Sequence, residues 1–184
     1  MSQKVLVPLA QGCEELEAVT IIDLLVRAQI EVVTAALDDN LEILCSRGVR
    51  LVAQTTLDNV LDEAFALVVL PGGLPGADYL NQDSRILQLL QRTHAQGGMV
   101  GAICAAPKVL ISAGLLDHQA ATGYPGVIDA APAEGMTYTG EAITQAGRVV
   151  TSRGPGTAMD FALSLIESLK GATVRQQVEA ALVR

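Results

Sequence analysis

The chain has 184 residues, of which 50% are apolar but only 3% aromatic, and its formal net charge is -8. This length suits one domain with a sizeable core, and a core of small aliphatic side chains suits helices packed on parallel strands. The acidic balance argues against nucleic-acid binding, which needs clustered Lys and Arg. No apolar run approaches the roughly 20 residues of a membrane span. We therefore expect a single domain over residues 1–184, with neither nucleic acid nor membrane as a partner.

The three cysteines, at positions 13, 45 and 104, form neither an even disulfide framework nor a CxxC knuckle. Residues 1–4 lead directly into the first apolar run, without a separate signal segment. A reducing compartment, the cytoplasm, is therefore expected. His94 is interpreted as a structural residue near a helix end and His118 as a solvent-facing loop residue. Neither has partners at metal-ligand spacing, so we predict no metal and no cofactor.

Apolar runs alternate with helically spaced segments along the whole chain. The pattern predicts strands over 4–9 and 31–37, short strands around 43 and 49–52, and strands over 66–70, 99–103, 136–139, 142–145 and 148–152. It predicts helices over 14–28, 84–96, 107–113, 157–169 and 174–182. This alternation favours a mostly parallel sheet with helices on both faces. In such a sheet, ligands lie at the carboxyl ends of the strands, at a topological switch point.

The most informative segment is 100–107 (VGAICAAP), in which an apolar strand runs into a single cysteine. Small residues follow Cys104, and Pro107 suits the first turn of a helix. This layout is typical of a nucleophile elbow, where backbone N–H groups at a helix start would lower the thiol pKa. A buried structural cysteine is the other interpretation, because free cysteines are often buried.

A second segment, 71–76 (PGGLPG), follows a buried strand directly. Its glycines allow backbone N–H groups to point into a pocket, as an oxyanion hole requires. An ordinary glycine-rich turn has the same composition. The spacing is not GxGxxG, so it does not indicate a dinucleotide site.

A third segment, 12–17 (GCEELE), places Glu17 among apolar residues one turn into the first predicted helix. A carboxyl group there either faces solvent or is buried, in which case burial raises its pKa. Cys13, four residues earlier, is expected on the same helix face, bordering the same pocket or simply buried. Cys45 is interpreted as a packing residue of a strand.

Taken together, these segments resemble the ThiJ/PfpI superfamily, in the branch that holds bacterial YajL and the human parkinsonism-associated protein deglycase. The matching stretches are GCEELE at 12–17, CSR at 45–47, VLPGG at 69–73, AICAAP at 102–107 and TSRGPGT at 151–157. They follow the family's order over nearly the whole chain. The resemblance implies a flavodoxin-like three-layer α/β sandwich with a cysteine nucleophile elbow, assembled as a homodimer.

The resemblance also implies roles for individual residues. Cys104 would be the reactive cysteine, Glu17 the carboxylic acid that hydrogen-bonds its sulfur, and Gly73 part of the oxyanion-hole turn. Because two adjacent anions disfavour each other, Glu17 is expected to keep its proton beside a Cys104 thiolate. The residues implied in substrate binding are Glu14, Glu15, Arg47, Gly72, Ala105, Tyr124 and Pro155, with Arg47 close to the dimer interface.

One position departs from the human member, which has a histidine before proline where this chain has Tyr124-Pro125. A phenol is a poor base near neutral pH, so base catalysis by a Cys-His pair is not expected. The resemblance still implies cofactor-free glyoxalase or deglycase activity on glyoxal or methylglyoxal adducts of proteins and nucleotides. The alternative is a non-enzymatic stress sensor or chaperone, in which Cys104 oxidises to a sulfinate stabilised by Glu17.

Overall fold

The structure is a computed structural model that describes residues 3–184; Met1 and Ser2, part of the predicted entry into the first strand, lie outside the described residues. Its centre is a seven-stranded sheet. The strands of this sheet are β1 (Lys4–Leu9), β2 (Glu31–Ala36), β5 (Thr55–Thr56), β6 (Leu67–Leu70), β7 (Met99–Ile103), β10 (Ile143–Ala146) and β11 (Val149–Ser152). Two small pairs lie outside it: β3 (Glu42–Leu44) with β4 (Arg50–Val52), and β8 (Ala120–Ala121) with β9 (Thr137–Tyr138).

The strand order is β5-β2-β1-β6-β7-β11-β10, and all neighbours are parallel except β10 and β11. Without the edge strands β5 and β10, the five parallel strands run in the order 2-1-3-4-5, which is that of flavodoxin-like folds. The predicted fold class is thus confirmed. The order reverses between β1 and β6, so the segments that follow these two strands meet at the switch point.

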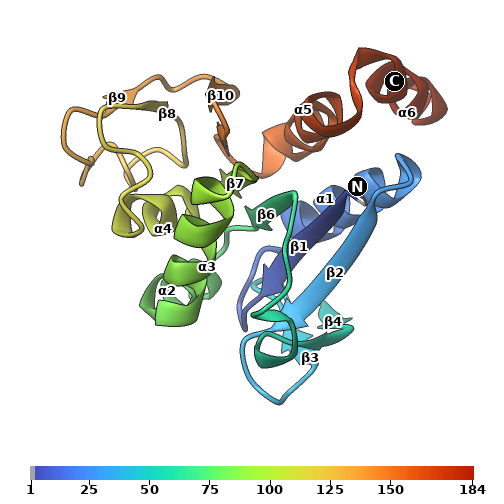
Figure 1. Ribbon diagram of the computed structural model, residues 1–184, viewed down its shortest axis with the longest axis horizontal. Coiled ribbons are helices and arrows are strands. Elements are labelled where there is room, and N and C mark those ends of the chain that lie inside the picture. Colours follow the sequence, from blue (N-terminus) through green and yellow to red (C-terminus); the bar gives the residue numbers. More distant parts are fainter. Residues whose placement is uncertain (1–2) are drawn as a thin grey trace.

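Helices cover both faces of the sheet, as Figure 1 shows. They are α1 (Glu15–Arg27), α2 (Gly76–Gln82), α3 (Ser84–Ala95), α4 (Pro107–Ser112), α5 (Ala158–Lys170) and α6 (Ala172–Ala181), with single 3-10 turns η1 (Asp58–Val60) and η2 (Pro155–Thr157). One core lies between the sheet and α1, α5 and α6, and the other between the sheet and α2, α3 and α4. Along β1, Val5, Val7 and Leu9 enter the first core and Leu6 the second, as the alternation of a strand requires.

The predicted elements all occur, with ends that move by one or two residues. The predicted helix over 14–28 is α1 together with its two capping residues, Glu14 and Ala28. Sequence reasoning missed the two-residue strands β5 and β8 and the helix α2. Helix α2 begins at Gly76, within the PGGLPG segment, and the turn-forming residues there hide the start of the helix.

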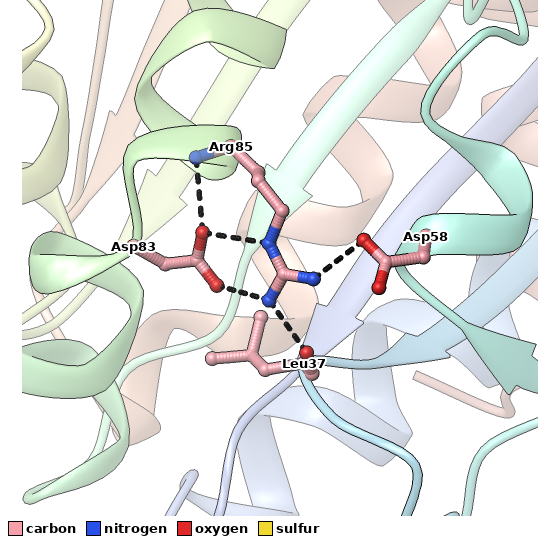
Figure 2. Close-up of polar contacts among 4 residues, drawn as sticks. All are labelled: Leu37, Asp58, Asp83 and Arg85. Atoms are coloured by element: carbon pink, nitrogen blue, oxygen red, sulfur yellow. Dashed lines mark hydrogen bonds and ion pairs between the residues drawn. The ribbon is translucent and has the colours of Figure 1, made fainter.

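Arg85 joins three segments at the edge of the second core, and Figure 2 shows its contacts. Its guanidinium donates to both carboxylate oxygens of Asp83, at 3.0 and 2.6 Å, and to Asp58 at 2.6 Å. It also donates to the carbonyl oxygen of Leu37, which follows β2, at 2.6 Å. Asp83 in turn caps the start of α3. A planar donor that satisfies two carboxylates and a carbonyl makes a specific contact that lysine cannot reproduce.

Replacing Arg85 with Ala should lower the free energy of unfolding by about 1–2 kcal/mol, because charge-assisted contacts of a partly buried group are lost. Burial would raise the pKa of Asp83, but the hydrogen bonds from Arg85 outweigh it and lower that pKa. A depressed carboxyl pKa stabilises the folded state above the unfolded value of about 3.9, and this stabilisation is lost as pH falls through the folded pKa. The difference in the free energy of unfolding between wild type and the Arg85→Ala variant should therefore become smaller in acid.

Urea denaturation at several pH values measures this deficit. Arg27→Ala is the matched control, since Arg27 pairs with Asp23 on the surface of α1 and both side chains are about half exposed. Its cost should stay within about 0.5 kcal/mol. Equal losses for the two variants would contradict a special role for Arg85.

Candidate active site

Cys104 lies at a sharp turn between β7 and α4. Its φ angle is 64°, in the left-handed region that non-glycine residues rarely adopt. Two hydrogen bonds hold this conformation. The Cys104 N–H donates to the Ser152 carbonyl oxygen at 3.0 Å, and the Cys104 carbonyl accepts from the Tyr124 N–H at 2.8 Å. A strained backbone fixed from both sides is the arrangement expected of a nucleophile elbow. Cys104 is 8% exposed as a whole residue, so it lies just beneath the surface.

The glycine turn after β6 lies against this cysteine. A Cβ atom on Gly72 would come within 2.7 Å of the Cys104 Cβ and 2.8 Å of the Ile103 carbonyl oxygen, so only glycine fits. The next residue, Gly73, has a φ of 86°. The backbone N–H groups of Gly73 and Ala105 both act on the Cys104 sulfur. These two donors are suited to stabilise negative charge on the sulfur or on an atom bonded to it.

Glu17 is fully buried in the first turn of α1. Its Oε2 accepts a hydrogen bond from the Gly72 N–H at 2.8 Å. Among the described residues, its Oε1 has no hydrogen-bond partner with regular geometry, and the carboxyl group interacts with the Cys104 thiol. A buried carboxylate normally has donors on both oxygens, whereas a protonated one needs an acceptor. The arrangement therefore fits a proton shared between the Glu17 carboxyl group and the Cys104 thiol.

Glu17 and Cys104 titrate as a coupled pair. Burial raises the pKa of Glu17 to about 7, despite the opposing hydrogen bonds from Gly72 and Cys104. Burial, followed by the charge and hydrogen bond of Glu17, raises the pKa of Cys104 to about 12, while the N–H groups of Gly73 and Ala105 lower it. The predicted lowering of the Cys104 pKa by the N–H groups of the turn is thus present, but burial and Glu17 outweigh it. The negative charge of Glu17 thus disfavours a thiolate beside it, so the pair resists carrying two negative charges.

The other two acidic residues of the GCEELE segment do not contact the thiol. Glu14 caps α1 by accepting from the Glu17 N–H at 2.8 Å. Glu15 accepts from the N–H groups of Arg47 and Val49 and from the Ser46 hydroxyl, and so holds the turn between β3 and β4. Burial opposes ionisation of Glu15, yet these hydrogen bonds lower its pKa. The side chain of Arg47 is exposed on that turn.

Tyr124 and Pro155 lie together in a groove of about 390 Å³ that is also lined by Arg153 and Gly154. The Tyr124 ring packs close to Gly154, at 3.4 Å from a Cβ built there. Cys104 is not among the lining residues, but its backbone carbonyl binds Tyr124. The groove is therefore joined to the Cys104 turn through the backbone of Tyr124. Sequence reasoning missed Arg153 and Gly154 as lining residues, although both lie within the TSRGPGT stretch.

Cys13 is simply buried, as one of the two interpretations had it: its thiol acts on neither Glu17 nor Cys104, and it lies before α1 rather than on the helix face of Glu17. It precedes the capping residue of α1, is fully buried, and its sulfur lies 3.7 Å from that of Cys45. Cys45 is buried, as expected, and follows the end of β3. All three cysteines are free thiols.

The histidines lie apart from the site. His94 is in the last turn of α3, and His118 is exposed in a loop. Within residues 3–184, no three His, Cys, Asp or Glu side chains are grouped so that they could hold a metal ion. In the same part of the chain, no helix combines the length and apolar character needed to cross a membrane.

The chain matches the DJ-1/PfpI family over residues 3–168. It is 38% identical over 183 residues to protein dj-1beta of Drosophila melanogaster, covering 100% of this chain and 98% of that protein. The chain belongs to the DJ-1/PfpI family. The glutathione-independent glyoxalase DJR-1.2 of Caenorhabditis elegans is 35% identical over 161 residues, covering 88% of this chain and 85% of that protein.

Solved structures of the family have the same fold. The crystal structure of Drosophila melanogaster DJ-1beta has a TM-score of 0.93 at 37% identity, covering 100% of this chain and 98% of that one. Oxidized Toxoplasma gondii DJ-1 has a TM-score of 0.92 at 39% identity, covering 98% of this chain and 97% of that one. The chain spans only 47% and 38% of the Arabidopsis thaliana DJ-1 homologs A and B.

Replacing Glu17 with Leu should lower the pKa of Cys104, because the charge and hydrogen bond of Glu17 raise it. The pH dependence of iodoacetamide alkylation measures this pKa, when it is followed on the tryptic peptide 93–108 that carries Cys104. Glu15→Gln is the control, because Glu15 does not act on the Cys104 thiol. A rise in the pKa of Cys104 in the Glu17→Leu variant would contradict this reading and would mean that Glu17 is a protonated donor to the thiolate.

Proposed function

We propose that this DJ-1/PfpI protein protects against dicarbonyl stress as a cofactor-free, cysteine-dependent glyoxalase or deglycase. The observation that carries the proposal is the buried Glu17 carboxyl, which interacts with a thiol that also faces the N–H groups of Gly73 and Ala105. A nucleophile, a proton carrier and oxyanion donors thus meet within one site. The name of the Caenorhabditis elegans relative, a glutathione-independent glyoxalase, supports the same reaction class.

In the proposed reaction, the Cys104 thiolate adds to the aldehyde carbon of methylglyoxal or glyoxal and forms a hemithioacetal. The N–H groups of Gly73 and Ala105 stabilise the oxyanion. Glu17 then moves a proton from the former aldehyde carbon to the neighbouring carbon, through an enediol, which leaves a thioester on Cys104. Water hydrolyses the thioester to lactate or glycolate and frees the thiol. The sequence consumes one water and needs no external oxidant or reductant.

The groove beside Tyr124 bears on the rate and on the substrate. The phenol of Tyr124 is a poor base near neutral pH, so Glu17 is the residue proposed to move protons between the substrate carbons. A positioned histidine would typically contribute ~10²–10⁴-fold as a general base, and because this chain has Tyr124 at that position, slow turnover is expected. The groove is open, which suits a small adduct on a protein or nucleotide as well as a free dicarbonyl.

Turnover of methylglyoxal tests the proposal, with lactate as the measured product and trace glyoxalases excluded by repurification to constant specific activity. Wild type should form lactate slowly, and Cys104→Ser should abolish it because the oxygen nucleophile is not ionised at neutral pH. Cys45→Ser, under reducing conditions, is the control that keeps activity. Equal rates for wild type and Cys104→Ser would refute the enzymatic proposal.

A second function is supported by the contact between the Glu17 carboxyl group and the Cys104 thiol. When Cys104 is oxidised to a sulfinate, a protonated Glu17 carboxyl would donate a hydrogen bond to it. A relative with this fold has been solved in an oxidized form. The three free thiols suit a reducing compartment such as the cytoplasm. We therefore propose a redox sensor or chaperone role as the alternative if turnover fails.

We also propose a homodimer formed by α1 and the β3–β4 hairpin. Val19 and Val26 on α1 and Val52 on the hairpin are 45%, 54% and 71% exposed, and they line one apolar groove. Exposed apolar side chains that share a groove indicate an interaction surface. Arg47 is exposed on the same hairpin. A second copy of the chain would bury this surface.

Sedimentation velocity at micromolar concentration should give a dimer, and the double change Val19→Asp and Val52→Asp should give a monomer. Burying two unpaired carboxylates costs several kcal/mol, enough to prevent association. Val183→Asp is the control, because Val183 is 95% exposed near the chain end and outside this groove. A wild-type monomer, or a double variant that still dimerises, would contradict the proposed interface.

A further inference from the structure

Cys13 and Cys45 form a pair of thiols that the Cys104 site does not use. Their sulfur atoms are 3.7 Å apart, although 32 residues separate them along the chain. Cys13 is fully buried and Cys45 is 4% exposed. Neither thiol acts on Glu17 or Cys104. The pair therefore requires its own explanation.

The backbone holds the two cysteines beside each other. The Gly12 N–H donates to the Leu44 carbonyl at 2.8 Å, and the Ser46 N–H donates to the Cys13 carbonyl at 2.8 Å. Each bond joins the segment before α1 to the segment around the end of β3. Sulfur atoms held this near are close to van der Waals contact, and a disulfide needs about 2.0 Å. The two sulfur atoms would therefore have to approach each other by about 1.7 Å.

The two thiols differ in their surroundings. The Cys45 thiol also lies 3.9 Å from the Ile43 carbonyl oxygen, to which it can donate. Its sulfur is then available to accept the thiol proton of Cys13. Cys45 is also the more exposed of the two. An oxidant entering from solvent therefore reaches Cys45 first, and the sulfur of Cys13 lies directly behind it.

We propose that Cys13 and Cys45 are a second redox site, which closes to an intramolecular disulfide when a hydroperoxide oxidises Cys45. In the first step the Cys45 sulfur attacks the peroxide, the O–O bond breaks, and a sulfenic acid and one molecule of water or alcohol form. In the second step the Cys13 sulfur attacks the sulfenic sulfur, the S–O bond breaks, and water leaves. The two thiols lose two electrons in all, and the peroxide accepts them.

The surroundings keep this pair reduced until an oxidant is abundant. Burial raises the pKa of both thiols, and the negative charges of Glu15 and Glu14 raise them further. Thiolate, the reactive form, is therefore scarce at Cys13 and Cys45 near neutral pH. The pair is set to respond more slowly than an ordinary exposed thiol, to sustained rather than brief oxidation.

The disulfide would form next to the glycine turn of the Cys104 site. A Cβ on Gly76 would approach the Cys13 nitrogen to 2.6 Å, and a Cβ on Gly73 would approach the Cys13 carbonyl carbon to 2.8 Å. The backbone of Cys13 thus packs directly on the turn that supplies the Gly73 N–H. Closing the bridge would tie the β3–β4 hairpin to this packed segment.

Peptide mapping of the full-length Cys104→Ser variant tests the proposal without the reactive thiol. The variant is treated with hydrogen peroxide, denatured, alkylated and digested with trypsin without reduction. Cys13 lies in peptide 5–27 and Cys45 in peptide 28–47. We expect one cross-linked species whose mass is the sum of the two peptides less two hydrogen atoms, within a chain of monomer mass. Reduction should restore both alkylatable thiols.

Cys13→Ser and Cys45→Ser in the same background are matched controls, and neither should give the cross-link. Cys13→Ser should leave Cys45 as an oxygenated thiol, whereas Cys45→Ser should leave Cys13 unmodified. Two freely alkylated thiols, separate oxygenation of each, or a bridge between chains would overturn the proposal. If Cys104→Ser does not fold, the wild-type map decides in the same way, because Cys104 lies in the separate peptide 93–108. This outcome is independent of methylglyoxal turnover.

Discussion

The hydrogen bond from the Gly72 N–H to the buried carboxyl of Glu17 is the interaction on which the candidate site depends. It spans the switch point of the sheet and joins the helix that follows β1 to the turn that follows β6. Because a Cβ on Gly72 would also meet Cys104, the same glycine sets the approach of the third segment, the elbow after β7. Three strand ends are thus fixed to one another by a residue that has no side chain.

This contact also sets the electrostatics of the site. A fully buried carboxyl group is costly to ionise, and a single N–H donor does not compensate for its lost hydration. Burial therefore raises the pKa of Glu17 to about 7, and the charge of Glu17 in turn raises the pKa of the Cys104 thiol beside it. The strained elbow and the Gly73 and Ala105 N–H groups supply the opposing influence, in favour of a thiolate. The proposed reactivity of Cys104 depends on this balance between the two residues.

Much of the fold was predictable because its signals are local. Buried parallel strands read as continuous apolar runs, and the AICAAP segment combines a strand, a cysteine and a helix-starting proline within a few residues. The contact between Cys13 and Cys45 has no such signal, because it depends on where a loop and a hairpin meet in space. The same holds for Glu15, whose neighbours in sequence suggest a pocket but whose partners lie in the turn at 46–49. Helical spacing also misplaced Cys13, because the helix begins only after it.

Because the chain has few aromatic residues, the candidate site can be followed by the absorption and fluorescence of its tyrosines. There is no Trp, and only three Tyr, so ultraviolet absorption and fluorescence of the protein come almost entirely from tyrosine. Tyr124 binds the Cys104 carbonyl through its backbone, and the Tyr138 hydroxyl donates to the carbonyl of the preceding residue, Gly123. Two of the three chromophores therefore flank one short loop beside the thiol. Changes in this loop register in the native emission without a label and without energy transfer to an indole.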